Sequence, residues 1–108
     1  MVQSVSLKPE PLRSLAFGSI SVSYAQIGTA ITNPSQLYYV QNLTNADMTF
    51  SQDGINDHFI LPAGGFLLLD VGSNHGLYGS LSVNAGTPLL VKGTATTGSV
   101  YLTTFYMG

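Results

Sequence analysis

Ser99 to Met107 has the sequence SVYLTTFYM, and this stretch decides the fold class because its side chains alternate with a period of two, as in a β-strand. One alternating set is apolar except for a threonine, and it contains Val100, Leu102, Thr104 and Tyr106. The other set contains Tyr101, Thr103, Phe105 and Met107. The stretch therefore predicts a β-strand near the end of the chain.

Similar short stretches recur along the chain, separated by Gly, Pro, Asn and Asp at intervals of about eight to twelve residues. The apolar frame shifts at Gly18, which indicates a bulge or a bend. Phe66 to Val71 is apolar on both faces until Asp70, which predicts an interior strand of a packed sheet. Further strands are predicted near residues 19–24, 37–42, 48–51, 58–61, 77–83 and 89–92.

The fold class that these stretches predict is all-β, with a single antiparallel β-sandwich of about eight strands over residues 15–108. A jelly roll is one arrangement of this kind, and the spacing of the strands does not give their order. The sequence contains no visible internal repeat or second domain.

Residues 1–14 differ from the rest of the chain. Pro9 and Pro11 exclude a helix and a regular central strand, so this segment is predicted to be an extended N-terminal arm. Either a neighbouring subunit holds the arm, or the arm folds back on its own sheet. We expect the arm to contact a partner through Leu7, Lys8, Pro9, Glu10, Pro11, Leu12 and Arg13.

The chain of 108 residues is poor in charge: only 7% of its residues are Asp, Glu, Lys or Arg, against roughly 25% in an average soluble protein. No concentrated Lys and Arg face is present, so nucleic acid is not an expected partner. Strand faces made of Ser, Thr, Tyr and aliphatic residues lose water at little electrostatic cost. The composition therefore predicts a surface that packs against other protein subunits.

The absence of cysteine excludes disulfides, thiolate zinc sites, iron–sulfur clusters and cysteine nucleophiles. The longest apolar run, Phe66–Leu69, is far shorter than the roughly 20 residues that span a bilayer, so no membrane segment is predicted. Residues 1–8 have neither a basic region nor an apolar region of the signal-peptide kind. We therefore expect synthesis in the cytoplasm without a signal peptide.

Few residues are available for catalysis. Asp53, Asp57 and His58 lie close together in the sequence and form the basis of one hypothesis, a hydrolase. Residues 53–57 could also offer oxygens to calcium, but they lack the EF-hand spacing, and Asp in such a stretch is typical of a turn. His58 and His75 have no third nitrogen or sulfur ligand nearby. We expect no catalytic residue, no metal site and no cofactor.

Six tyrosines are candidates for an interface or for stacking on sugar rings. Tyr38 and Tyr39 must point to opposite faces of one strand, so at least one of them is expected outside the main core. We expect an interface, and assign Tyr38, Tyr39, Tyr101 and Phe105 to it together with the arm. Carbohydrate recognition by a host-recognition module is the alternative.

Residues 42–58, with the sequence NLTNADMTFSQDGINDH, are followed by Leu61–Gly64, Leu69-Asp70 and residues 86–93, GTPLLVKG. Together with the Val100-Tyr101-Leu102 strand, this pattern resembles small all-β virion structural proteins of tailed bacteriophages. The resemblance covers roughly residues 20–108 and assigns no catalytic residue. It implies a non-enzymatic component of the virion, and we expect a capsid-associated cement or decoration protein. The alternative virion positions are a neck or tail adaptor and a fibre base.

The expected partners are other virion proteins, in the capsid or in the neck and tail. A homo-oligomer is expected, either a trimer or a ring, with no nucleic acid and no membrane among the partners. The sequence cannot distinguish these symmetries, because they place similar demands on the surface of one subunit.

Overall fold

The computed structural model describes residues 7–70, 75–76, 79–80 and 82–107, and the regular structure in this part of the chain is β apart from one short 3-10 turn, η1 (Phe17–Ser19). The strands are β1 (Leu7–Pro9), β2 (Arg13–Ala16), β3 (Ala25–Gln26), β4 (Ser35–Thr44), β5 (Met48–Ser51), β6 (Phe59–Leu61), β7 (Phe66–Asp70), β8 (His75–Gly76), β9 (Gly79–Ser80), β10 (Leu90–Lys92) and β11 (Gly98–Met107).

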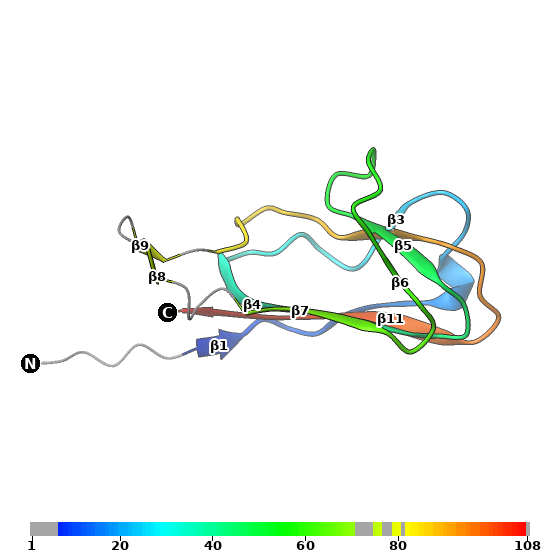
Figure 1. The fold of residues 1–108 in the computed structure, drawn as a ribbon, viewed down its shortest axis with the longest axis horizontal. Helices are drawn as coiled ribbons and strands as arrows, with labels where there is room; N and C mark the ends of the chain where they lie inside the picture. The colour runs from blue at the N-terminus through cyan, green and yellow to red at the C-terminus, as the bar shows by residue number, and fades with distance from the viewer. Residues whose placement is uncertain (1–6, 71–74, 77–78, 81, 108) are drawn as a thin grey trace, which may run out of the picture.

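Two antiparallel sheets pack face to face (Figure 1). The large sheet has the order β1-β11-β4-β7, and β2 also pairs with β11. The small sheet has the order β3-β10-β5-β6, and β8 and β9 form a separate two-stranded ribbon. The predicted antiparallel sandwich is therefore confirmed, whereas this strand order does not confirm a jelly roll.

The two longest strands, β4 and β11, form the centre of the large sheet. They pair from Gly98 opposite Thr44 to Tyr106 opposite Ser35, and the register shifts between Phe105 and Tyr106. Alternate residues of both strands are buried against the small sheet, in agreement with the period of two in their sequences. The remaining residues of these strands point to the other side of the large sheet.

The core lies between the two sheets. The Phe50 and Phe59 rings of the small sheet stack with their centroids 5.0 Å apart. The fully buried hydrophobic residues include Ile27, Tyr38, Val40, Met48, Phe50, Val91 and Val100. Residues from both sheets and from the connection before β4 therefore form one core.

Asn42 is a polar residue inside this core, with no exposed surface. Its Nδ2 atom donates to the carbonyl oxygens of Ala46 and Leu61, both at 2.9 Å, and its Oδ1 atom accepts from the Thr44 backbone at 3.1 Å. A buried amide is stable only with such partners. Asn42 therefore ties the turn after β4 to the end of β6.

The predicted strand at residues 19–24 is wrong. Phe17–Ser19 forms η1, and Val22, predicted to be half-buried, is 80% exposed. The Ser21 hydroxyl accepts from the Ser23 backbone N–H at 3.3 Å, and such local bonds compete with strand pairing. Of the two alternatives predicted at Gly18, a bulge or a bend, the 3-10 turn corresponds to the bend.

β7 is an edge strand of the large sheet, so the prediction of an interior strand at residues 66–71 is wrong. Leu67 and Leu69 pack on the core, whereas Phe66 and Leu68 are 62% and 49% exposed. In a two-layer sandwich only one face of each sheet is covered, so a strand that is apolar on both faces leaves one apolar face open.

The described part of the N-terminal segment belongs to the sandwich, and the predicted boundary at residue 14 falls inside β2. β1 pairs with residues 105–107 of β11, and β2 pairs with residues 99–102 (Figure 1). Pro9 is accommodated because β1 is at the edge of the sheet. Of the two alternatives for the arm, folding back on its own sheet therefore holds for residues 7–14. Residues 1–6 are outside the described part.

The region around residues 71–83 is described only in part. Residues 72–76, GSNHG, have the residue types of a turn, but His75–Gly76 forms β8. Gly79–Ser80 forms β9 within the predicted strand at 77–83. Residues 71–74, 77–78 and 81 are outside the described residues, so the rest of these two predictions stays untested.

Candidate functional site: the open face of the large sheet

The loop at residues 53–57 is a turn in which Asp53 binds its own backbone. The Asp53 Oδ1 atom accepts from the backbone N–H groups of Asn56 and Ile55, both at 2.8 Å, and Oδ2 accepts from the Asn56 side chain at 3.0 Å. These hydrogen bonds hold the pKa of Asp53 well below its usual range. Both carboxylate oxygens are thus engaged within the turn, as the turn interpretation requires.

His58 and Asp53 are brought together by this turn. His58 Nδ1 accepts from the Gln52 backbone N–H at 2.9 Å, and His58 Nε2 lies 3.8 Å from Asp53 Oδ2. Within the described residues, no group of three His, Cys, Asp or Glu side chains is arranged to hold a metal ion. The contacts of His58 therefore support the geometry of the turn.

Asp57 joins a separate surface cluster with Tyr24 and Lys92. The Tyr24 hydroxyl donates to Asp57 Oδ1, and Lys92 Nζ lies 3.0 Å from the same atom. Lys92 Nζ also lies 4.6 Å from the centroid of the Tyr24 ring. Desolvation, with the hydrogen bond to Asp57, raises the pKa of Tyr24 to about 12. The cluster connects the segment before β3 to β10 and to the 53–57 turn.

Glu10 and Arg13 form a buried ion pair, with Arg13 Nη2 at 2.8 Å from Glu10 Oε1. Arg13 Nε donates to the Thr29 carbonyl at 2.7 Å, and Glu10 Oε2 accepts from the backbone and side chain of Asn33 at 2.8 and 2.9 Å. Desolvation would raise the pKa of Glu10, but the hydrogen bonds from Asn33, Arg13 and Thr32 together lower it. We call the Glu10–Arg13 pair, with its partners Thr29 and Asn33, the clamp. The clamp joins the N-terminal segment to the connection before β4.

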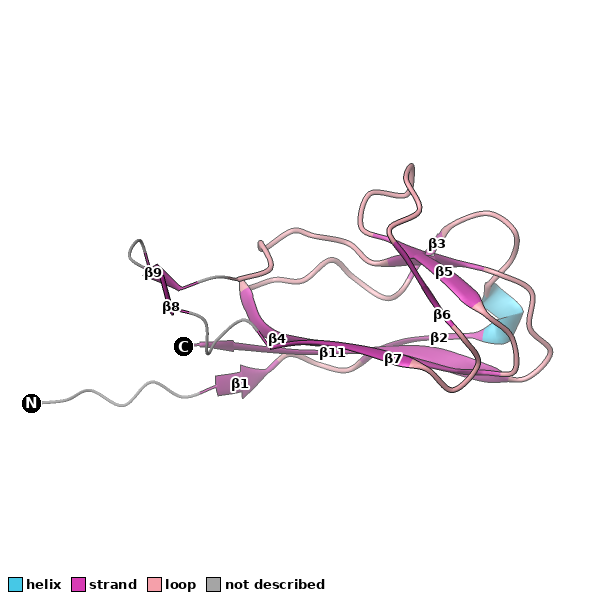
Figure 2. Ribbon diagram, viewed as in Figure 1, coloured by secondary structure: helices cyan, strands magenta, loops and turns pink. Residues whose placement is uncertain are grey.

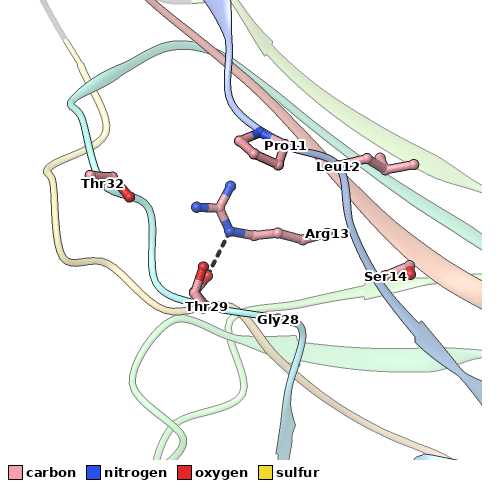
Figure 3. Close-up of a pocket in the computed structure, with 7 residues that line it drawn as sticks. All are labelled: Pro11, Leu12, Arg13, Ser14, Gly28, Thr29 and Thr32. Carbon is pink, nitrogen blue, oxygen red and sulfur yellow. Dashed lines mark hydrogen bonds between the residues drawn. The ribbon is translucent and has the colours of Figure 1, made fainter.

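An open cleft of about 410 Å³ lies beside the clamp (Figure 3). The guanidinium of Arg13 points into the chain toward Thr29, where all of its described polar contacts are with groups of this protein. Thr104, which interrupts the apolar set of the last strand, faces this guanidinium at 3.4 Å from Nη1. The Arg13 guanidinium therefore serves the fold. The cleft is lined by Pro11, Leu12, Arg13, Ser14, Gly28, Thr29 and Thr32.

The face of the large sheet that points away from the small sheet carries a regular array of three residues from each of β4, β7 and β11. Residues in each row are direct partners across the strands, and we call this array the open face. Its rows are Tyr101, Gln41 and Phe66; Thr103, Tyr39 and Leu68; and Phe105, Leu37 and Asp70.

The open face is mostly apolar and aromatic, and it is nearly uncharged. Phe66 and Leu68 are the most exposed hydrophobic residues in it, and the Tyr39 and Phe66 rings meet edge to face with centroids 5.7 Å apart. Asp70, at one corner, is its only charged residue. In the described part of the chain the small sheet covers only the opposite side of the large sheet (Figure 2). A contiguous apolar surface of this kind is typical of an interaction site.

The predicted interaction residues separate into two groups. Tyr39, Tyr101 and Phe105 are half-buried members of the open face. Leu7, Lys8, Pro9, Pro11 and Leu12 are exposed at or beside the β1 edge. The remaining predicted residues belong to neither group, because they are buried within the fold: Glu10, Arg13 and Tyr38.

The sequence analysis missed Phe66 and Leu68 as candidate interaction residues. The sequence signal that could have identified them is the run from Phe66 to Leu69, which is apolar on both faces of the strand. In a protein without predicted helices, nothing is available to cover the second face of such a strand. The run therefore pointed to an uncovered face as well as to a strand.

Comparisons with protein-family models, with curated proteins and with solved structures find no match to this chain. No helix in the described residues is long and apolar enough to cross a membrane. The function therefore has to be inferred from the site itself.

Proposed function

We propose that this protein is a non-enzymatic assembly component that packs on a neighbouring subunit through the open face. The observation that carries the proposal is the array centred on Tyr39, with Asp70 as its only charge. Burial of such a face removes aromatic and aliphatic surface from water without stripping water from many charges. Leu68 and Phe66 supply the most exposed hydrophobic surface of the array.

The setting that we propose is a tailed bacteriophage virion, where the protein acts as a capsid-associated cement or decoration protein. The resemblance of residues 20–108 to small virion proteins supports this setting, and the uncovered, nearly uncharged face of the large sheet suits a subunit that works in contact with others. A neck or tail adaptor or a fibre base uses the same kind of surface. These positions differ in the number of copies that each particle contains.

The experiment that tests the virion assignment is quantitative mass spectrometry of purified phage particles that encode this chain. Hundreds of copies per particle support a decoration protein, and a copy number that fits one ring supports a neck or tail adaptor. Absence of the chain from particles that are otherwise complete overturns the virion assignment.

Two matched variants test the role of the open face in assembly. Leu68 and Ile60 are both exposed aliphatic residues on edge strands, at 49% and 64%, but Ile60 belongs to β6 of the small sheet. Leu68→Lys is expected to reduce incorporation into particles, whereas Ile60→Lys leaves it unchanged. Equal incorporation of both variants contradicts a role of the open face in assembly.

Carbohydrate recognition is the second candidate, because the open face presents aromatic rings with Gln41 and Thr103 between them. Aromatic rings pack on pyranose rings, and amide and hydroxyl groups bind sugar hydroxyls. A glycan array, followed by titration of any hit into isotope-labelled protein, tests it. Shifts at Tyr39 and Gln41 support this candidate, and an array without binding eliminates it.

A further inference from the structure

We propose that the neighbouring subunit on the open face is a second copy of this chain, related to the first by a twofold axis. This inference rests on the proposed function and names its partner. Its starting point is the array of residues on β4, β7 and β11, which nothing in the described part of the chain covers.

The charge of the open face fits a second copy. A partner with a strongly charged surface gains no ion pairs from this array, in which only Asp70 is charged. Asp70 lies at a corner, with Phe66 and Phe105 at the two adjacent corners. A twofold axis that lies between the two copies above Tyr39 runs either along the strands or across them. An axis along the strands places Asp70 of one copy over Phe105 of the other, and an axis across the strands places it over Phe66. In neither case do the two Asp70 side chains meet. Two copies meet without like-charge repulsion at the array.

The distribution of other exposed hydrophobic residues favours a twofold pair over a ring. A ring joins two different patches of each subunit, whereas a twofold interface joins one patch to itself. Four exposed large hydrophobic residues of the described part lie outside the large sheet and the segment 7–12. They are Phe17 in η1, Val22 and Ile55 in two different loops, and Ile60 in the short strand β6. No second apolar array comparable to the open face is present among the described residues, so the open face is its own best match.

The area of the large sheet is sufficient for a stable pair. At about 3.4 Å per residue and about 4.8 Å between strands, the residues of β1, β2, β4, β7 and β11 cover about 500 Å² in projection. For an axis across the strands, which lays the large sheet of one copy over that of the other, two copies bury about 1,000 Å², which reaches the size at which specific interfaces begin. Face-to-face packing of two sheets also brings side chains into contact at a layer spacing of about 10 Å.

The first test is the mass of the purified full chain in solution, measured by sedimentation and by native mass spectrometry. The chain has a mass of 11.4 kDa, so we expect a species of twice 11.4 kDa that dissociates on dilution. A protein that stays at 11.4 kDa up to about 1 mM overturns the proposal. A trimer, or a ring of three or more copies, overturns it as well.

The second test places a charge on the open face and a matched charge elsewhere. Leu68→Lys is expected to raise the dimer dissociation constant about 100-fold or more, because a twofold interface contains the substitution twice. Ile60→Lys is the control, and we expect no change in the constant. Dissociation by Ile60→Lys, or an unchanged constant in Leu68→Lys, overturns the assignment of the interface to the open face.

Circular dichroism and urea unfolding establish that each variant is folded. If Leu68→Lys does not fold, Phe66→Lys replaces it, since Phe66 is 62% exposed and lies in the same array. The twofold pair and the virion assignment can each be overturned without the other. A monomeric protein that is still present in particles overturns the twofold pair alone, whereas a dimer that is absent from particles overturns the virion assignment alone.

Discussion

Tyr38 and Tyr39 are the same residue type at adjacent positions of β4, and they lie in opposite environments. Tyr38 has no exposed surface and packs in the core between the sheets. Tyr39 is half-buried at the centre of the open face, between Thr103 and Leu68. The period of two in a strand separates them, and only the presence of the small sheet makes one side a core and the other a surface.

The two faces of the large sheet also differ in the charged residues that they carry. The covered face includes Arg13, in a buried ion pair with Glu10, and the fully buried amide of Asn42. The uncovered face has Asp70 as its only charged residue. The covered face still carries the hydrophobic core, so only the open face departs from the usual distribution, in which charged residues face water. This departure supports the proposal that another subunit covers the open face.

The largest expected difference between the faces is the effect of Tyr38→Ala against Tyr39→Ala. Tyr38→Ala leaves a cavity in the core and is expected to lower the free energy of unfolding by about 3–5 kcal/mol. Tyr39→Ala removes a half-buried side chain and is expected to cost less than about 1.5 kcal/mol in dilute protein. Urea unfolding at a concentration where the protein is monomeric measures both. Equal losses contradict the distinction between a covered and an open face.

A second prediction concerns the buried charge on the covered side. Glu10→Gln leaves the Arg13 guanidinium buried without its counter-charge and is expected to cost about 3 kcal/mol in the free energy of unfolding. The double variant Glu10→Gln with Arg13→Met removes both charges and is expected to regain most of this loss, because a buried pair often breaks even with apolar residues. Urea unfolding at pH 7 compares the three proteins. A double variant less stable than Glu10→Gln alone contradicts this account.

The sandwich and most of its strands were predictable from the sequence, because alternation and turn residues are local signals. The prediction of a strand at 19–24 was wrong for a reason that is also local: the Ser21 hydroxyl accepts a hydrogen bond from the Ser23 backbone. The pairing of the N-terminal segment with the large sheet was not predicted, for a different reason. Its partner strand, β11, lies at the far end of the chain, and pairing over such a distance leaves no signal in the spacing of residues.

The candidate site was predictable only in part. Alternation correctly separates Tyr38 from Tyr39 and groups Tyr101 with Phe105, but it does not show which group faces the core. That assignment depends on which strands pair and on where the second sheet packs. The strand order also decides that β7 lies at an edge next to β4, which brings Phe66 into contact with Tyr39.

The third prediction concerns the pH dependence of the clamp. Folding lowers the pKa of Glu10 below its ordinary value of 4.5. The unfolded chain therefore takes up the proton first as the pH falls, and the stability due to this carboxylate, complete above pH 4.5, is lost as the pH falls through the lower folded pKa. The folded pKa values of Asp53 and Asp57 are lowered as well, so they contribute to the same acid loss. The difference between wild type and Glu10→Gln isolates Glu10, and it is expected to shrink below pH 4.5. A difference that is constant with pH contradicts an ionised Glu10 in the clamp.

The smallest expected effect comes from the exposed ion pair of Lys92 and Asp57, which has nearly the same separation as the buried pair, 3.0 against 2.8 Å. Water surrounds the exposed pair, and the cost of holding two side chains in place offsets most of the attraction between their charges. Lys92→Met keeps an unbranched aliphatic side chain and removes the charge that lies beside Asp57 and over the Tyr24 ring. Its urea midpoint is therefore expected to match that of wild type, in contrast to the large loss in Glu10→Gln. If both variants lose the same stability, the burial of the clamp has no energetic consequence.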